Sequence, residues 1–208
     1  MKTIKIIKTK IGIMAISIMA ALILTLSFLT ISAYATENSI KNNVLRLHIL
    51  AASDREYDQQ IKIKVRNRLI SEAPSIFEDC ENKEEAILKT QSKLDEILLT
   101  VKDELSINNA DMTVKVSIEN KYFPVKEYGE YTFPAGSYDA LVITLGEGEG
   151  KNWWCVIFPP LCLTEESVAF KNESVLKDGG FTKNEIKTLK SGKPEYKLKL
   201  KLLEWIFG

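Results

Sequence analysis

Hydrophobic positions divide the chain into one unbroken apolar segment at its start and a longer stretch of alternating and helical patterns. The first segment runs from Ile11 to Ile31 without a charge. Beyond it, patterns of period two and period 3.6 predict a strand, two helices and then several more strands. This order is typical of an α+β domain. We expect a mostly antiparallel sheet of about four to five strands with two main helices, preceded by the N-terminal apolar helix.

The most apolar stretch of the later part is Trp153–Phe158, WWCVIF. A run without a polar break is typical of a strand buried on both faces. Pro159 and Pro160 must end this strand, because proline cannot donate to a strand ladder. We expect it at the centre of the core. The preceding strand, 138–145, would pair with it as an antiparallel hairpin through the glycine-rich loop 146–151.

Residues 44–50, VLRLHIL, also alternate and predict a strand. One face of this strand carries only apolar side chains. The other face mixes apolar residues with Arg46 and His48, the only histidine of the chain. A charged and a titratable side chain on a mostly apolar strand make both residues candidates for a role in activity or in the fold.

Two helices are predicted directly after this strand. Ser53 and Glu56 have the spacing of a capping box, which predicts a helix start. Apolar residues at helical spacing continue that helix until Pro74, which should bend or end it. A second amphipathic stripe predicts a helix over 83–105. After it, residues 113–118 alternate and predict a half-buried strand.

The C-terminal region is less regular. Residues 164–193 are polar and predict a linker with one helical turn near 183–189. The end of the chain, 196–207, fits both a strand and a short helix, because its apolar residues match either period. We treat 36–208 as a single exported α+β domain.

The N-terminal segment 1–35 has the three parts of a secretory signal peptide. Four lysines precede the apolar run, and Ala33 and Ala35 after it form an A-x-A cleavage motif. The apolar run of 21 residues would extend about 31 Å as a helix, which also suffices for a membrane anchor. Cleavage after Ala35 and retention as an anchor both fit. In either case the flanking lysines keep the N-terminus inside, so that the domain is exported.

The net charge of the domain bears on which class of partner it can bind. The chain carries 28 basic and 28 acidic residues, and subtracting the four N-terminal lysines leaves 24 basic against 28 acidic. A nucleic-acid-binding domain needs a basic surface, so the slightly acidic domain argues against that class. We expect no nucleic-acid partner.

Export makes a disulfide between Cys155 and Cys162 chemically allowed, with the two prolines between them turning the chain back. Such a bond requires Cα atoms within about 4.4–6.8 Å. The alternative is two buried free thiols that pack as small hydrophobic side chains. Cys80 would remain unpaired.

His48 and Cys155 could in principle form a hydrolase pair with Asp54 as the orienting acid. The residue count allows this, but a cysteine inside an apolar strand has a raised pKa and is a poor nucleophile. No short pair of ligands indicates a metal site. Loop 146–151 lacks the glycine spacing and the following helix of a phosphate site. We therefore expect no catalytic residues, no metal and no cofactor.

Trp153 and Trp154 are neighbours on one strand, so they must point to opposite faces. Both can be buried only if the sheet is covered on both sides, in three layers. The alternative is that one of them lies on a partner-binding surface, where tryptophan is enriched.

Four motifs resemble those of the stage II sporulation protein R family: 44–54, 58–69, 133–141 and 146–162. The resemblance covers most of the exported domain, and the last motif is long and specific. No catalytic residues are established for the family. The matched candidates for partner binding or for the fold are Arg46, His48, Asp54, Trp153, Trp154, Pro159 and Pro160, together with the two cysteines of the candidate disulfide.

The resemblance implies a signalling protein that is made in the forespore and exported across the forespore membrane into the intermembrane space. There it would trigger a membrane-embedded aspartic protease of the mother cell, which removes the pro-sequence of sigma-E. It would be secreted, or associated with the membrane through its N-terminal segment if that is not cleaved. No small-molecule substrate is implied. The alternative is an exported Cys/His hydrolase acting on cell wall or peptide.

Overall fold

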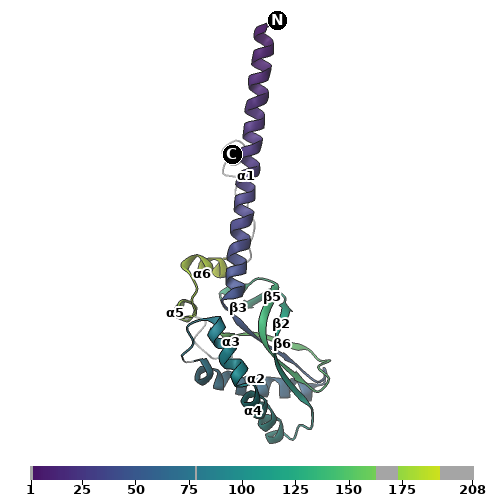
Figure 1. The fold of residues 1–208 in the computed structure, drawn as a ribbon. Helices are drawn as coiled ribbons and strands as arrows, with labels where there is room; N and C mark the ends of the chain where they lie inside the picture. Colours follow the sequence, from purple (N-terminus) through teal and green to yellow (C-terminus); the bar gives the residue numbers. More distant parts are fainter. Residues whose placement is uncertain (1, 78, 163–172, 193–208) are drawn as a thin grey trace. The chain divides into compact units, whose positions relative to one another are not determined.

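The computed structural model describes residues 2–77, 79–162 and 173–192 (Figure 1). The chain divides into two compact units, Met1–Ser39 and Ile40–Gly208. Helix α1 (Lys2–Asn42) makes up the first unit except for its last residues, from Ile40 on, which belong to the second. Within the described residues, Lys10–Asn42 is the one helical stretch long and apolar enough to cross a membrane, a property that a signal sequence shares. The predicted N-terminal apolar helix is therefore confirmed.

The second unit is built on a four-stranded sheet in the order β2-β5-β1-β6. Its strands are β1 (Leu45–Leu50), β2 (Val114–Phe123), β5 (Gly136–Leu145) and β6 (Asn152–Phe158). β1 runs parallel to β5 and antiparallel to β6, and β2 runs antiparallel to β5. The predicted α+β class is confirmed, with a mixed sheet whose pairings are mostly antiparallel.

The tryptophan strand β6 is buried on both faces, as expected, but the predicted hairpin with the preceding strand is wrong. Among the described strands, β6 lies at an edge of the sheet, and β1 separates it from β5, so the predicted β5–β6 hairpin does not form. His48 of β1 pairs with Val142 on one side and with Trp154 on the other. The unbroken apolar run of β6 indicates that both faces of the strand are covered. It carries no information on how many strands lie beside it.

Three helices cover one face of this sheet (Figure 1). They are α2 (Glu56–Phe77), α3 (Lys83–Ser92) and α4 (Leu94–Ile107). Ile61, Val65 and Leu69 form the buried stripe of α2. Burying a large aliphatic side chain contributes about 1.5–3 kcal/mol relative to leaving it exposed. This apolar stripe, repeated on α4, therefore holds the helices on the sheet.

Two details of the helices differ from the prediction, and one prediction is narrowed. The single helix over 83–105 is broken at Lys93, whose backbone (φ −109, ψ 13) leaves the helical region. The prediction that Pro74 bends or ends the helix is narrowed, because α2 continues past Pro74 to Phe77. The capping box of Ser53 and Glu56 does not form, because the Ser53 hydroxyl bonds to Asp58.

The opposite face is covered by a small hairpin and two short helices. The hairpin consists of β3 (Lys126–Tyr128) and β4 (Tyr131–Phe133). The helices are α5 (Glu173–Asp178) and α6 (Lys183–Lys190), and α6 begins with a capping box of Thr182 and Glu185. The sheet is therefore the middle of three layers.

The linker prediction for 164–193 is corrected where the structure describes it. Leu176 of α5 and Ile186 and Leu189 of α6 are buried in the core. The predicted helical turn at 183–189 is confirmed as α6. The prediction for 196–207 lies outside the described residues.

Candidate functional site

The candidate residues lie on β1 and β6 and on the loops at both ends of these strands. Arg46 pairs with Val156, and His48 with Trp154. Arg46, His48 and Trp154 point to the face covered by the hairpin, whereas Trp153 and Cys155 belong to the helix-covered face. The structure therefore brings three of the predicted residues together and separates two others from them.

Arg46 is completely buried inside a cage of aromatic rings. Its guanidinium carbon lies 4.5 Å from the ring centroid of Phe123, 4.9 Å from that of Tyr138, and 5.6 Å from those of Tyr128 and Phe133. Its Nη2 donates a hydrogen bond to the Tyr128 hydroxyl at 3.2 Å. The faces of aromatic rings carry negative potential, so the cage stabilises the cation where no carboxylate pairs with it among the described residues.

The cage joins separate parts of the domain. Phe123 and Tyr138 belong to β2 and β5, whereas Tyr128 and Phe133 belong to the hairpin. Burial lowers the pKa of Arg46, and the nearby tyrosines act in the opposite direction. Its Nε and Nη1 have no hydrogen-bond partner within the described structure. Arg46 thus acts mainly as a packing centre that holds the hairpin on the sheet.

His48 stacks on Trp154, with ring centroids 3.9 Å apart and planes 14° from parallel. Phe123 approaches both rings edge-on. Burial lowers the pKa of His48, while the neighbouring Asn152 side chain acts in the opposite direction. The ring therefore behaves as part of an aromatic cluster, and the arrangement favours its neutral form.

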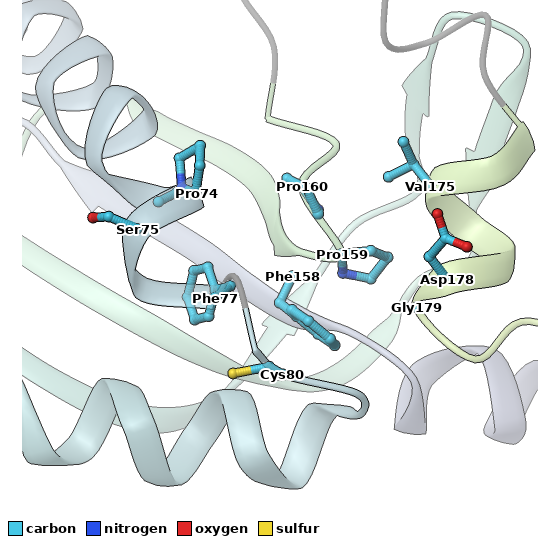
Figure 2. A pocket seen from close by; sticks show the side chains of 11 residues that line it. Pro74, Ser75, Phe77, Cys80, Phe158, Pro159, Pro160, Val175, Asp178 and Gly179 are labelled. Carbon is cyan, nitrogen blue, oxygen red and sulfur yellow. The ribbon is translucent and has the colours of Figure 1, made fainter.

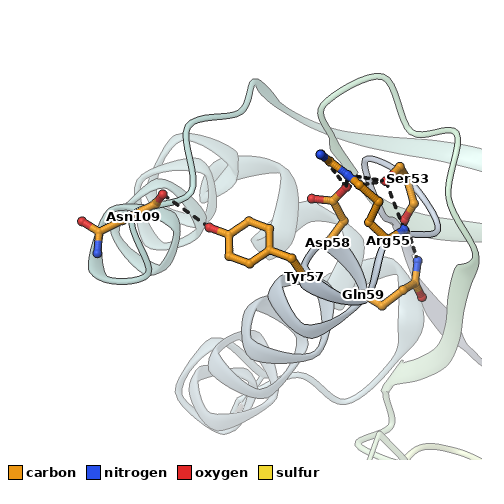
Figure 3. Close-up of polar contacts among 6 residues, drawn as sticks. All are labelled: Ser53, Arg55, Tyr57, Asp58, Gln59 and Asn109. Carbon is orange, nitrogen blue, oxygen red and sulfur yellow. Dashed lines mark hydrogen bonds and ion pairs between the residues drawn. The ribbon is translucent and has the colours of Figure 1, made fainter.

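A polar network connects β1 to the start of α2 (Figure 3). Asp58 is almost fully buried and accepts hydrogen bonds from the Ser53 hydroxyl and from Arg55 Nε, the latter at 3.1 Å. Gln59 Nε2 donates to the Ser53 carbonyl at 2.9 Å. These bonds hold the β1–α2 junction in one conformation, since a buried carboxylate must be matched by donors.

The same junction holds the loop before β6. Asp54 Oδ1 accepts a hydrogen bond from the Lys151 backbone N–H at 2.7 Å. The Lys62 ammonium donates to the Lys151 carbonyl at 2.8 Å and to Gln59 Oε1 at 2.6 Å. Burial lowers the pKa of Lys62, while the charge of Asp54 raises it. The motifs 44–54 and 146–162, which are far apart in sequence, are thus held together by these hydrogen bonds.

Gly150 permits this close approach. A Cβ at this position would lie 2.3 Å from the Ser53 carbonyl oxygen, closer than any van der Waals contact. Its N–H donates to the Ala51 carbonyl at 2.9 Å. The glycine is required here by space, because the β1–α2 junction passes directly over it.

Trp153 is half-buried on the helix-covered face of the sheet. The Arg66 guanidinium of α2 lies 4.1 Å from the centroid of its ring. Trp153 and Trp154 therefore each pack into a different layer, as the three-layer alternative requires. Lys62 and Arg66, one turn apart on α2, both fasten this helix to β6 and the loop before it.

The structure joins Cys155 to Cys162, with Cα atoms 5.5 Å apart. The bond encloses Pro159, which is buried, and Pro160, which is exposed. Cys80 is a free cysteine, and burial raises the pKa of its thiol. Oxidation of the pair in the exported protein stays a prediction that a thiol count can test.

The hydrolase alternative finds no geometric support. Cys155 pairs with Leu47, one position from His48, so the cysteine and histidine side chains point to opposite faces of the sheet. Asp54 bonds to the Lys151 backbone and does not orient His48. No group of three or more metal-ligating side chains occurs among the described residues.

The aromatic cage and the two basic residues of α2 are missing from the sequence prediction. A signal for the cage does exist. An arginine in an apolar strand needs a compensating partner, and Phe123, Tyr128, Phe133 and Tyr138 are all aromatic within one short region. Lys62 and Arg66 have the i, i+4 spacing of residues that share a helix face.

Comparison with known proteins adds two similarities. A family model described as stage II sporulation protein R matches residues 41–168. A curated relative, the stage II sporulation protein R of Bacillus subtilis (strain 168), is 39% identical over 150 residues. These residues are 71% of this chain and 65% of the relative, so the match spans less than two thirds of the relative's length. No solved structure matches the chain.

Proposed function

This chain belongs to the stage II sporulation protein R family, and from that premise we propose that it is an exported sporulation signal that acts by docking. In this proposal the domain crosses the forespore membrane into the intermembrane space. There it triggers the membrane-embedded aspartic protease of the mother cell, which matures the pro-sigma-E factor. The chain itself catalyses no reaction.

The observation that carries the docking proposal is the separation of His48 and Cys155. The only histidine of the chain is stacked on Trp154, on the sheet face opposite Cys155. Once oxidised with Cys162, as proposed for the exported protein, Cys155 could not act as a thiolate either. The nucleophile and base of the rival hydrolase are therefore not within reach of each other.

Export is supported by α1. Its apolar run is preceded by lysines and is long enough to span a bilayer. If the anchor is retained, the domain is confined near a membrane surface. Confinement raises the effective concentration of the domain at a membrane-embedded partner without any new contact.

Activation by docking needs only a difference in affinity. A ligand shifts a protease toward its active arrangement if it binds that arrangement more tightly than the inactive one. A tenfold shift in population requires about 1.4 kcal/mol of preference. A single well-packed apolar side chain at an interface can supply a preference of this size.

The test measures sigma precursor cleavage in a sporulating host whose own copy of this gene has been removed. Full-length protein should restore cleavage, and His48→Ala should retain it in proportion to the amount of folded protein. The Cys155→Ser, Cys162→Ser double variant serves as the second arm. Steady-state turnover of a wall fragment or peptide by the purified chain, lost in either variant, would contradict the proposal.

A further inference from the structure

A cavity of about 500 Å³ lies beyond the C-terminal end of β6 (Figure 2). Its walls come from the last turns of α2 and the loop after it, from the end of β6 and the two prolines that follow, and from α5 and the glycine after it. Its lining is mostly apolar and includes Pro74, Phe77, Phe158, Pro159 and Val175. This volume falls in the range of pockets that hold a ligand or a large side chain.

The walls of the cavity are fixed by covalent and packing contacts. The Cys155–Cys162 bond closes the segment that carries Phe158, Pro159 and Pro160. Phe158 packs against Phe77 of α2, with ring centroids 5.8 Å apart. On the opposite side, a Cβ at Gly179 would lie 2.7 Å from the Pro159 ring, so α5 ends directly against the proline. The cavity therefore exists before any ligand arrives, which reduces the entropic cost of binding.

The surroundings of the cavity are acidic. Asp178 lines it, is exposed, and makes no ion pair among the described residues. Asp79 and Glu81 flank Cys80, another lining residue. The Asp79 side chain is 87% exposed, and its ion pair with Lys89 spans 3.4 Å. Exposed pairs of this kind contribute little to stability, so the local charge remains available to a partner.

An apolar cavity beside the carboxylate of Asp178, unpaired within the described part of the chain, fits a segment that presents a large apolar side chain next to lysine or arginine. We infer that this cavity is the docking site for such a segment, belonging to the exported face of the membrane-embedded partner. This inference rests on the proposed function and names the surface through which that function would be exerted. The apolar side chain fills the cavity, and the neighbouring cation pairs with Asp178.

The first experiment places a photo-crosslinking amino acid at single positions of the full-length chain, in a sporulating host that lacks its own copy. Position 74 lies in the cavity lining on α2 and is exposed. Leu99, on α4, is 65% exposed and does not line the cavity, so it is the matched control. We expect crosslinks to the aspartic protease from position 74 and none from position 99.

The second experiment blocks the cavity. Pro74→Trp places a bulky side chain at its wall, and Ser71→Trp places the same side chain one turn earlier, outside the lining. Asp178→Arg reverses the charge beside the cavity, and Asp103→Arg makes the same change on α4. We expect the two cavity variants to lower the rate of sigma precursor cleavage roughly tenfold or more, and the two controls to retain it.

The outcomes separate the inference from the proposed function. Crosslinks to the protease from position 99 alone, with normal cleavage in Pro74→Trp, would overturn the cavity as the docking site and leave the docking function standing. Crosslinks from position 74 that stay within the chain would also overturn it. Normal precursor cleavage after complete removal of the chain would overturn the proposed function itself. If a cavity variant fails to accumulate, the crosslinking result decides.

Discussion

Asp54 accepts a hydrogen bond from the backbone N–H of Lys151 at 2.7 Å, across a separation of 97 residues. This bond ties the segment that follows β1 to the loop that leads into the edge strand β6. Lys62 reinforces it by donating to the carbonyl of the same Lys151. The ladder with β1 positions β6 itself, and these polar atoms hold the loop that leads into it.

Asp54→Ala should destabilise the domain by about 1–2 kcal/mol, because it leaves the Lys151 N–H without its acceptor. Hydrogen exchange of the Lys151 amide should accelerate more than that of amides in α4. Asp54→Asn keeps a side-chain oxygen at the same place and serves as the control. Equal exchange rates in the Ala and Asn variants would show that the bond does not hold the loop.

Gly150→Ala should cost about 1–3 kcal/mol or more, because its Cβ would meet the Ser53 carbonyl at 2.3 Å. Thermal unfolding of the full chain in detergent measures this loss. Gly180→Ala is a useful comparison. Its Cβ meets nothing within 4 Å, but its φ of +83 is unfavourable for alanine. A Gly150→Ala variant as stable as the wild type would mean that the junction can move away.

Arg46→Ala should destabilise the domain by roughly 3 kcal/mol, because it empties the centre of the aromatic cage. Arg46→Met fills most of the same space and removes a buried charge that lacks a carboxylate partner. Its loss should be less than half that of the Ala variant. Chemical unfolding of the three proteins distinguishes the cases, and equal losses would indicate that cation–π attraction outweighs packing.

Acidification should destabilise the folded domain through His48. Burial lowers the pKa of His48 below its ordinary value near 6.5, so the unfolded chain binds the proton first as the pH falls. The stability from neutral His48 is complete above about pH 6.5 and declines as the pH drops from there toward the folded pKa.

The control for this pH effect is His48→Phe, which keeps an aromatic ring against Trp154 and cannot titrate. The difference in melting temperature between the wild type and this variant should change between pH 7.5 and pH 5.5, with the wild type losing more on acidification. Parallel curves for the two proteins would show that His48 is accessible to protons in the folded state at no cost.

If the protein is exported as proposed, it should show one reactive thiol after denaturation without reductant, and three after reduction. The single thiol is that of Cys80, since Cys155 and Cys162 are joined. Cys155→Ser together with Cys162→Ser should lower stability by roughly 2–3 kcal/mol on the chain-entropy estimate for a short loop. Three thiols without reductant would exclude the disulfide.

Local sequence patterns predict most of the helices and strands, but they do not predict which strands lie side by side in the sheet. The alternation around Leu47 and Ile49 predicts β1 correctly, because a strand covered by a helix layer must repeat apolar residues at period two. The run through Trp153 predicts β6 equally well. Its place at the sheet edge depends on the pairing of His48 with Trp154, which is a long-range contact without a local signal.

The candidate site, too, could be predicted from the sequence only in part. Arg46, His48 and Trp154 stand out by their type, and the structure places them on one face. The role of Arg46 could not be read from its strand alone, because its cage comes from β2, the hairpin and β5. The break at Lys93 was missed because the apolar stripe of α3 and α4 continues across it with nearly helical spacing.

The strand order also determines when the domain can fold during synthesis. β1 is the first strand of the chain, yet β5 and β6, which flank it, follow only after three helices, β2 and the hairpin. Until β5 and β6 emerge from the ribosome, β1 has no ladder partner to close on. Non-local pairings of this kind form slowly. If the chain is exported as proposed, this topology would keep it unfolded while it passes through a membrane channel.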